Sequence, residues 1–260
     1  NSFAAVAKDS SVCEVEKAVS ENMWGDLQIN IVVKGLTEGT TMVYLKRGDT
    51  ILAGYRVTVK TLLADAVTFK DPGLAEAMLG IGSGADKNGD GYISTNEMMA
   101  VDYLNLGGYQ INDLSVLEAA ENLETLTLSG CDLTDLGLLT IVLPRVSYLD
   151  ISGNQITDLS GIENLPNLKS LDLSDNQLSN LAVLKTADLS RIEDLYLRGN
   201  EIQSLASLRS TGAARAQETG LSSVKDLDLS DNPLEDMAGL ECFTSLEVLN
   251  MQGCGVKDLD

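Results

Sequence analysis

Residues 86–97 carry oxygen-bearing side chains at the spacing of a twelve-residue calcium-binding loop. The segment reads Asp86-Lys-Asn-Gly-Asp-Gly-Tyr-Ile-Ser-Thr-Asn-Glu97. Ca²⁺ takes six to eight oxygen ligands, and such loops supply them at positions 1, 3, 5, 7, 9 and 12 around a glycine at position 6. The spacing predicts calcium ligands at Asp86, Asn88, Asp90, the carbonyl of Tyr92, Ser94 and a bidentate Glu97. The alternative is a polar turn that binds no metal.

Two short helices are expected to flank this loop. Asp71 and Pro72 can begin a helix with proline at its first position, and the glycines from Gly80 onward end it. Ser94 can cap a second helix that runs through Met99. Residues 63–100 are therefore predicted to form a helix-loop-helix cap, whose apolar face covers the first unit of the segment that follows.

A leucine pattern repeats seven times from residue 101 to residue 260. Successive units follow the form L-x-x-L-x-L-x-x-N-x-L and are 22 to 32 residues apart, with the last unit partial. A period near 22 residues predicts an α/β solenoid, a leucine-rich-repeat right-handed coil with parallel strands. An insertion over residues 209–223 is expected to bulge from the convex side. The units begin at Val101, Leu123, Val146, Leu168, Ile192, Val224 and Leu246.

The strand positions between the leucines point outward and can recognise a partner, because side chains alternate along a strand. Counting from each repeat start places aromatic and acidic side chains together there, where aromatics anchor a partner and charges steer it. The alternative is that aspartates only keep the strand face soluble and prevent edge aggregation. The predicted partner-binding residues are Tyr103, Tyr148, Asp150, Asp172, Asp194, Tyr196, Arg198, Asp226 and Asp228.

Residues 1–62 differ from the repeats in periodicity and charge. Alternating apolar residues over 27–31, 42–45 and 51–59 predict short antiparallel strands, with turns at 37–39 and 47–49. We expect a small β-rich, sandwich-like domain here. A helix is expected near Cys13 to Ser20.

Composition excludes several classes of function. The net charge is −21, and residues 101–260 hold 26 acidic and nine basic side chains, which disfavours binding to nucleic acid. The chain has no histidine, which removes the usual general base and most catalytic metal sites, so we expect no enzyme. Its four cysteines lack CxxC spacing and are expected to be free. No segment is apolar for long enough to span a membrane.

The repeat Ile151-Ser-Gly-Asn154-Gln-Ile156-Thr-Asp-Leu159 resembles the short leucine-rich repeats of internalin-like bacterial surface proteins. The segment from Val67 to Leu79, followed by the calcium-type loop, resembles the N-terminal cap of secreted bacterial repeat proteins. The resemblance covers residues 64–260. It implies a curved solenoid with parallel strands inside and short 3₁₀ or irregular segments outside, used for protein binding or adhesion at the cell surface. The loop itself resembles a single EF-hand; dockerin modules use such loops in duplicate.

Together these features predict a secreted or bacterial cell-surface binding protein. Its concave face is expected to hold a protein, a basic one being compatible with the charge, or a glycan. A structural calcium ion is expected to staple the cap to the first repeat. The alternative is a spacer or assembly module of a larger surface protein, without a ligand of its own.

Overall fold

The computed structural model describes residues 3–11, 13–21, 27–35, 39–47, 49–59, 66–80, 84–187, 189–209 and 221–256. The chain forms two compact units, residues 1–64 and 65–260, which are described separately. Residues 37, 38 and 48 of the turns expected at 37–39 and 47–49, and most of the expected bulge over 209–223, lie outside the described residues.

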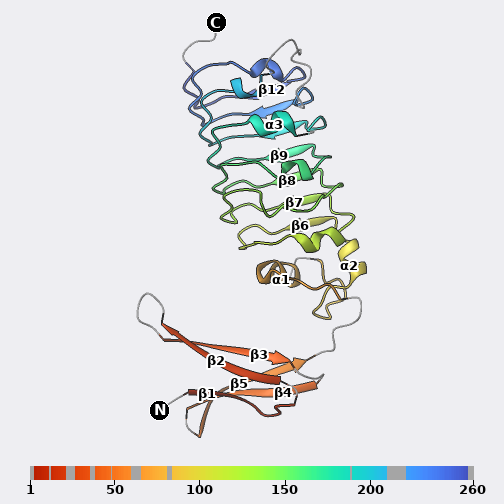
Figure 1. Cartoon of the computed structure of the whole chain (residues 1–260), viewed down its shortest axis with the longest axis vertical. Coiled ribbons are helices and arrows are strands. Elements are labelled where there is room, and N and C mark those ends of the chain that lie inside the picture. Colours follow the sequence, from red (N-terminus) through yellow and green to blue (C-terminus); the bar gives the residue numbers. More distant parts are fainter. Residues whose placement is uncertain are drawn as a thin grey trace. The chain divides into compact units, whose positions relative to one another are not determined.

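The first unit is built from antiparallel strands (Figure 1). Strands β1 (Phe3–Ala7), β4 (Gly39–Arg47) and β5 (Thr50–Val59) form one sheet, in the order β1-β4-β5. Strands β2 (Cys13–Glu21) and β3 (Leu27–Gly35) form a second pair. The helix expected near Cys13 to Ser20 is wrong, because these residues pair in register with β3.

The second unit begins with two short helices that share a core with the repeats. Helix α1 (Pro72–Leu79) has Asp71 as its N-cap, and helix α2 (Thr95–Met99) is capped by Ser94, as expected. Burial of an apolar side chain is the main stabilising term in folding. Leu74, Ala77, Met78 and Met98 are buried in the same cluster as Leu104 and Leu106 of the first repeat.

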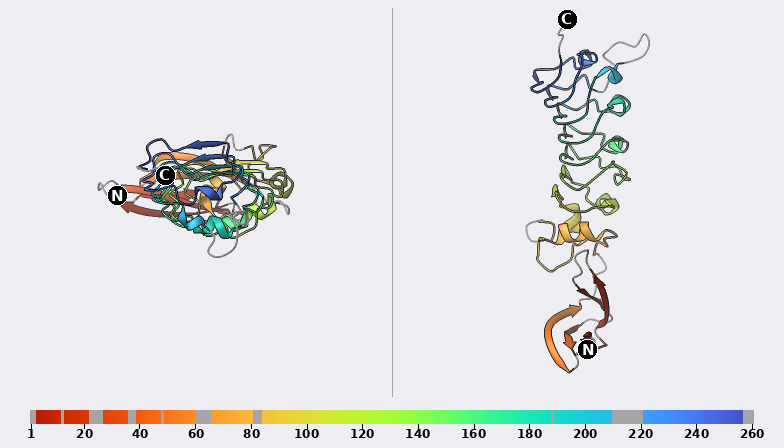
Figure 2. Two further views of the ribbon diagram at one scale, coloured as in Figure 1. Left: turned by 90° about the horizontal axis from the view of Figure 1, so that it is seen from above. Right: turned by 90° about the vertical axis from the view of Figure 1, so that its left-hand side faces the viewer.

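Seven short parallel strands then stack into one sheet in chain order, as the repeat spacing predicts (Figure 1). Short helical segments between the strands form a column along one side of the coil (Figure 2). They are α3 (Ala182–Thr186) and 3₁₀ turns at Ser115–Ala119, Ile162–Asn164, Ala206–Leu208 and Leu240–Cys242. The strands are β6 (Tyr103–Asn105), β7 (Thr125–Thr127), β8 (Tyr148–Asp150), β9 (Ser170–Asp172), β10 (Asp194–Tyr196), β11 (Asp226–Asp228) and β12 (Val248–Asn250).

The middle leucine of each strand points into an aliphatic core. This leucine is at most 1% exposed in β6 to β11, whereas Leu249 of β12 is 37% exposed. The difference arises because β12 is the last strand of the sheet in the described part of the chain. Full burial of one leucine side chain contributes about 1.5 to 3 kcal/mol, so the repeated leucine largely sets the stability of the stack.

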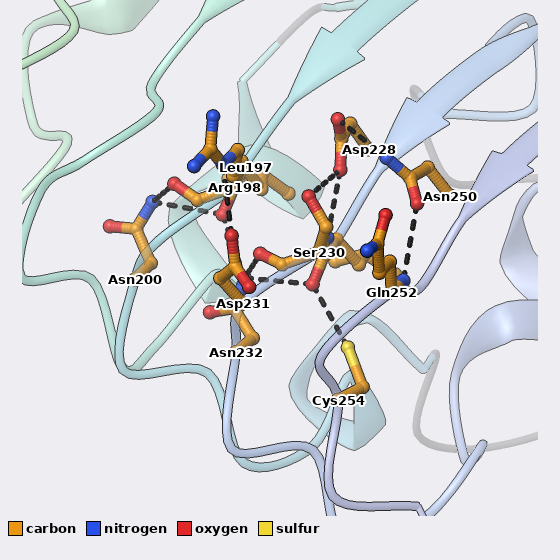
Figure 3. Close-up of polar contacts among 11 residues, drawn as sticks. Leu197, Arg198, Asn200, Asp228, Ser230, Asp231, Asn232, Asn250, Gln252 and Cys254 are labelled. Atoms are coloured by element: carbon orange, nitrogen blue, oxygen red, sulfur yellow. Dashed lines mark hydrogen bonds and ion pairs between the residues drawn. The ribbon is translucent and has the colours of Figure 1, made fainter.

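A ladder of buried asparagines joins successive repeats at the turn after each strand. The Nδ2 of Asn200 donates to the carbonyl of Leu197 in its own repeat (Figure 3). It also donates to the carbonyl of Leu173 in the preceding repeat. Cys131 and Cys254 occupy this asparagine position, and each thiol donates to a carbonyl of the preceding repeat. Cys131 and Cys254 are free thiols, as expected; the side chain of Cys13 lies outside the described atoms.

Candidate partner-binding face and calcium loop

The outward side chains of β6 to β12 form two rows, which we call the strand face. The sheet register sets these rows and matches the positions counted from the repeat pattern. The first row is Tyr103, Thr125, Tyr148, Ser170, Asp194, Asp226 and Val248, and the second is Asn105, Thr127, Asp150, Asp172, Tyr196, Asp228 and Asn250.

Aromatic and acidic side chains gather in the middle of the strand face, on β8 to β11. Tyr103 and Tyr148 are 53% and 36% exposed, and Tyr196 is half-buried. The register places Tyr196 between Asp172 and Asp228 in the second row. The structure therefore brings the predicted tyrosines and aspartates onto one face.

Three aspartates of the second row have a local structural role that the sequence analysis did not assign. Asp150 and Asp228 each accept from the main-chain N–H and the hydroxyl of the serine two residues later. Asp172 accepts from the N–H of Ser174. Such Asx turns satisfy backbone donors where a strand ends. The Asp-x-Ser spacing is the sequence signal that could have revealed this role.

Asp194 and Asp226 differ from those three aspartates. They lie directly opposite each other on β10 and β11. Within the described residues, neither carboxylate accepts a hydrogen bond or joins an ion pair. Burial raises the pKa of Asp194, and the carboxylates of Asp226 and Glu193 raise it further. Lys225 lowers the pKa of Asp194 again, but it forms its ion pair with Glu193, at 2.6 Å.

The two tyrosines lie in the same negative field. Burial raises the pKa of Tyr148, followed by the charges of Asp150 and Asp172. Burial also raises the pKa of Tyr196, followed by the charges of Asp194, Asp226 and Asp172. Both phenols are therefore neutral well above pH 7 and can donate a hydrogen bond from the strand face.

Arg198 lies just beyond the second row and its charge is already paired. Its Nε is 3.0 Å from Oδ2 of Asp231 in the next repeat (Figure 3). Both side chains are more than half exposed. Arg198 therefore lies at the edge of the predicted partner surface, with its charge neutralised by Asp231.

The predicted calcium loop is a tight turn organised around Asp86. Oδ1 of Asp86 accepts from the N–H groups of Gly89 and Asp90, and Oδ2 accepts from Gly91, at 2.8 to 3.2 Å. Gly91 has φ +86°, a conformation that a residue with Cβ rarely adopts, as expected for position 6. Oδ1 of Asn88 accepts from the N–H of Asp90.

Glu97 closes this loop from its far end. Its Oε1 accepts from the N–H groups of Lys87 and Asn88, at 3.0 and 3.2 Å, and its Oε2 accepts from the N–H and hydroxyl of Ser94. These bonds form a capping box with α2. They bring positions 2, 3, 9 and 12 of the loop together, and the Ser94 bonds hold the pKa of Glu97 below its ordinary value.

The donor set suits a hard cation, with one restriction. In the part of the chain that the structure describes, no three acidic or cysteine side chains are gathered closely enough to hold a metal ion by themselves. An ion in this loop would therefore depend on the amide oxygen of Asn88 and on main-chain carbonyls such as that of Tyr92, besides the carboxylates.

One surface cavity lies away from the strand face. It measures about 430 Å³ and is lined by residues 110–112, 131–135 and 138, none of which belongs to the predicted partner surface. Among the described residues, no helix has the length and apolar character needed to cross a bilayer.

Comparison with known proteins identifies the repeats. The family described as Leucine Rich repeats (2 copies) matches residues 121–164 and 144–186. No curated protein sequence matches the chain. Among solved structures, the internalin inlF of Listeria monocytogenes is similar with a TM-score of 0.50 and 25% identity, over 74% of this chain. This chain spans 58% of that internalin.

The internalin C2 (inlC2) of Listeria monocytogenes is similar with a TM-score of 0.52 and 22% identity, over 77% of this chain and 94% of that one. At this identity the likeness concerns the fold. With the seven-stranded parallel sheet and the matched repeats, it shows that this chain has a leucine-rich-repeat solenoid of the internalin-like kind.

Proposed function

We propose that this chain is a secreted or cell-surface binding protein that recognises a protein partner through its strand face. The fold is of a kind suited to protein binding, because a stack of repeats presents an extended, rigid surface. The observation that carries the proposal is the gathering of Tyr148 and Tyr196 among aspartates that lack a cation. Tyrosine combines a large apolar surface with a donor, which makes it a frequent anchor of interfaces.

A structural spacer, the second candidate, has no need for such a surface. A spacer gains nothing from exposed aromatic side chains grouped on one face, and Tyr103 and Tyr148 are among the exposed large hydrophobic side chains of the described solenoid. Scattered single exposed apolar residues would carry no such meaning. The grouping in two adjacent rows therefore favours the binding role.

The binding proposal is tested by comparing a double variant and a single control variant in pull-downs from cell-surface and extracellular fractions. The variant Tyr148→Ala with Tyr196→Ala removes both anchors. The control, Val142→Ala, removes an apolar side chain that is 57% exposed elsewhere on the solenoid. A partner retained by the wild type and control but lost by the tyrosine variant supports the proposal. Equal retention by all three proteins excludes the strand face as the binding surface.

We also propose that residues 86–97 hold a structural calcium ion. Support comes from the oxygen donors on Asp86, Asn88 and Asp90 in one turn and from the return of Glu97 to that turn. Asp86, Asn88, Asp90, the carbonyl of Tyr92, Ser94 and Glu97 would hold the ion. Calcium would add charge neutralisation to a loop whose carboxylates converge, between helices that share the core of the first repeat.

Glu97→Gln is the variant that separates calcium binding from helix capping. Glutamine serves at the third position of a capping box, so α2 keeps its cap while the loop loses a charge. The matched control is Glu118→Gln, on an exposed 3₁₀ turn. Ligand at a hundred times its dissociation constant stabilises the folded state by about 2.7 kcal/mol.

In calorimetric titrations we expect Ca²⁺ to bind the wild type and the Glu118→Gln control, and to raise the melting temperature of both. We expect Glu97→Gln to lose the binding heat and the shift. Absence of binding to the wild type, or an equal shift in all three proteins, would show that the loop is a metal-free turn.

A further inference from the structure

Several aspartates of the solenoid accept hydrogen bonds from local backbone donors. At turns between the strands, an aspartate accepts the N–H two residues later; examples are Asp113 with Ser115 and Asp135 with Gly137. Asp158 and Asp236 do the same, and the second-row aspartates cap the strand ends. Turn chemistry therefore accounts for these aspartates.

Asp194 and Asp226 remain outside this explanation. They are adjacent in register on parallel strands, which lie about 4.8 Å apart, and like charges placed directly opposite destabilise a sheet. Their neighbour Lys225 is engaged by Glu193. This repulsion between two aspartates is not offset by any hydrogen bond within the described residues. The pair therefore does not stabilise the fold, which points to a role in binding.

Two tyrosines lie near Asp194, on the side of the pair away from Asp226. Tyr196 lies two residues after Asp194 on β10, and Tyr148 lies in the same row as Asp194, two strands away. Between Tyr148 and Asp194 the first row holds only Ser170, a small side chain. Burial raises the pKa values of Asp194, Tyr148 and Tyr196, and the charges of neighbouring carboxylates raise each of them further.

Neither outward row of β6 to β12 contains a lysine or arginine. A cation must therefore come from the partner. A guanidinium group fits best, because its planar fork can donate to two carboxylates and its face can stack on a tyrosine ring. An ammonium group satisfies the charge alone, and a metal ion lacks a third acidic ligand within the described residues.

We propose that Asp194 and Asp226, with Tyr148 and Tyr196, form a subsite for an arginine side chain of the protein partner. This inference rests on the proposed binding role of the strand face and names the chemical group recognised there. Asp194 and Asp226 supply the acceptors, and the two tyrosines supply stacking surface and phenol donors.

The test uses acetyl-arginine-amide as the probe, titrated into the ¹⁵N-labelled full chain. The lysine analogue and the uncharged citrulline analogue are the matched ligands. We expect amide shifts at residues 148, 170, 194 and 226 with the arginine probe, weaker shifts with lysine and none with citrulline. Asp194→Asn with Asp226→Asn should weaken binding at least about tenfold, because charge-assisted bonds are lost.

Two further variants sharpen the measurement. Tyr148→Ala with Tyr196→Ala should weaken binding about threefold, as expected for loss of cation–π contacts. Glu118→Gln with Glu121→Gln removes two charges from exposed sites outside the strand face and should change affinity by less than about twofold. The double asparagine variant should also unfold at a urea concentration no lower than the wild type, since it removes a repulsion.

The outcomes separate the two proposals. Shifts spread over the acidic surface, or equal weakening by the Glu118 and Glu121 control, would overturn the arginine subsite. If the tyrosine variant loses a protein partner while the probe gives no shift, the binding role stands and the subsite is wrong. If the probe binds at this site and no partner depends on the tyrosines, the subsite stands and the proposed function fails.

Discussion

Asp71 connects the N-terminal helix to the first repeat through Asn112. Oδ1 of Asp71 accepts from the N–H of Leu74 at 2.9 Å, which caps α1, and Oδ2 accepts from the N–H of Asn112 at 2.7 Å. Asp71 is only 5% exposed. One buried carboxylate therefore satisfies the backbone donor of Leu74 and that of Asn112, which lies 41 residues after Asp71 in the sequence.

Replacement of Asp71 by asparagine should destabilise the solenoid. The amide oxygen can still cap Leu74, but the amide nitrogen cannot accept from Asn112, so the N–H of this part-buried bond loses its partner. We expect a loss of about 1 to 3 kcal/mol in urea unfolding followed by circular dichroism. Asn112→Ala is the control, because it keeps the main-chain donor and should cost less. Equal losses of unfolding free energy in both variants would contradict a stabilising role of the bond between Asp71 and the N–H of Asn112.

The stabilisation by Asp71 should depend on pH. Burial raises the pKa of Asp71, but the N–H groups of Leu74 and Asn112 outweigh burial and hold it below its ordinary value. A carboxyl whose folded pKa is lowered stabilises fully above its unfolded pKa, near 4, and loses this contribution as the pH falls toward the folded pKa. The difference in unfolding free energy between wild type and Asp71→Asn should therefore be constant at pH 6 to 7 and shrink below about pH 4.

The asparagine ladder gives a second prediction, at Asn176. Its Nδ2 donates to the carbonyls of Ile151 and Leu173, and its Oδ1 accepts from the N–H of Ile156. Asn176→Ala leaves these buried groups unpaired and should cost about 2 to 4 kcal/mol. Asn176→Cys should cost less, because the thiols of Cys131 and Cys254 show that cysteine can donate to the preceding repeat.

The control for Asn176 is Asn167→Ala. Asn167 is an exposed asparagine that also donates to the preceding repeat, at the carbonyl of Pro144. Water can replace that bond, so its loss should be small. Urea midpoints in the order wild type, Asn167→Ala, Asn176→Cys, Asn176→Ala are expected, and a cysteine variant as unstable as the alanine variant would be evidence against a donating thiol.

The repeat region could be predicted in detail because one physical cause dominates it. Each strand begins two residues after a repeat start, as at Tyr148 and Asp194, because buried leucines fix which positions face the core. The caps at Asp71 and Ser94 were equally visible, since capping chemistry is local. Leucine spacing and helix caps act between residues close in sequence, so the folded chain keeps the structure that they predict.

Features that depend on partners distant in sequence were less visible. Strand β2 contains Glu, Lys and Ala, which favour helices, but its pairing with β3 overrides that preference. On the strand face, five aspartates occupy equivalent outward positions. A serine two residues later marks Asp150, Asp172 and Asp228 in the sequence, but the structure was needed to show that these three bind their own turns.

Arg198 gives a prediction that distinguishes stability from recognition. Its ion pair with Asp231 is exposed, and exposed pairs contribute little to folding. Arg198→Gln should leave the urea midpoint unchanged within error. Because it exposes the Asp231 carboxylate at the rim, it should increase the association rate of a basic partner at low salt, measured by stopped flow. An unchanged rate at low salt would remove Arg198 from the recognition surface.

The turn after each solenoid strand contains a residue with positive φ. Where this residue is an aspartate, its side chain limits which residue fits at the same turn position of the next repeat. Gly199 has φ +67°, and a Cβ placed on it would collide with Oδ1 of Asp175 in the preceding repeat. Gly108 has φ +79° and open space around its Cβ position. Gly108→Ala should therefore cost only the left-handed strain, about 1 to 2 kcal/mol, and Gly199→Ala should cost more.

Asp175→Gly should rescue Gly199→Ala, because it removes the carboxylate that the new methyl group meets. The double variant should then lose no more than Gly108→Ala, and the double-mutant cycle should give a coupling of about 1 kcal/mol between Asp175 and Gly199. Additive losses in that cycle would mean that the two turns move apart freely. A rescue shows instead that adjacent repeats are packed tightly enough for an aspartate in one turn to require a glycine in the next.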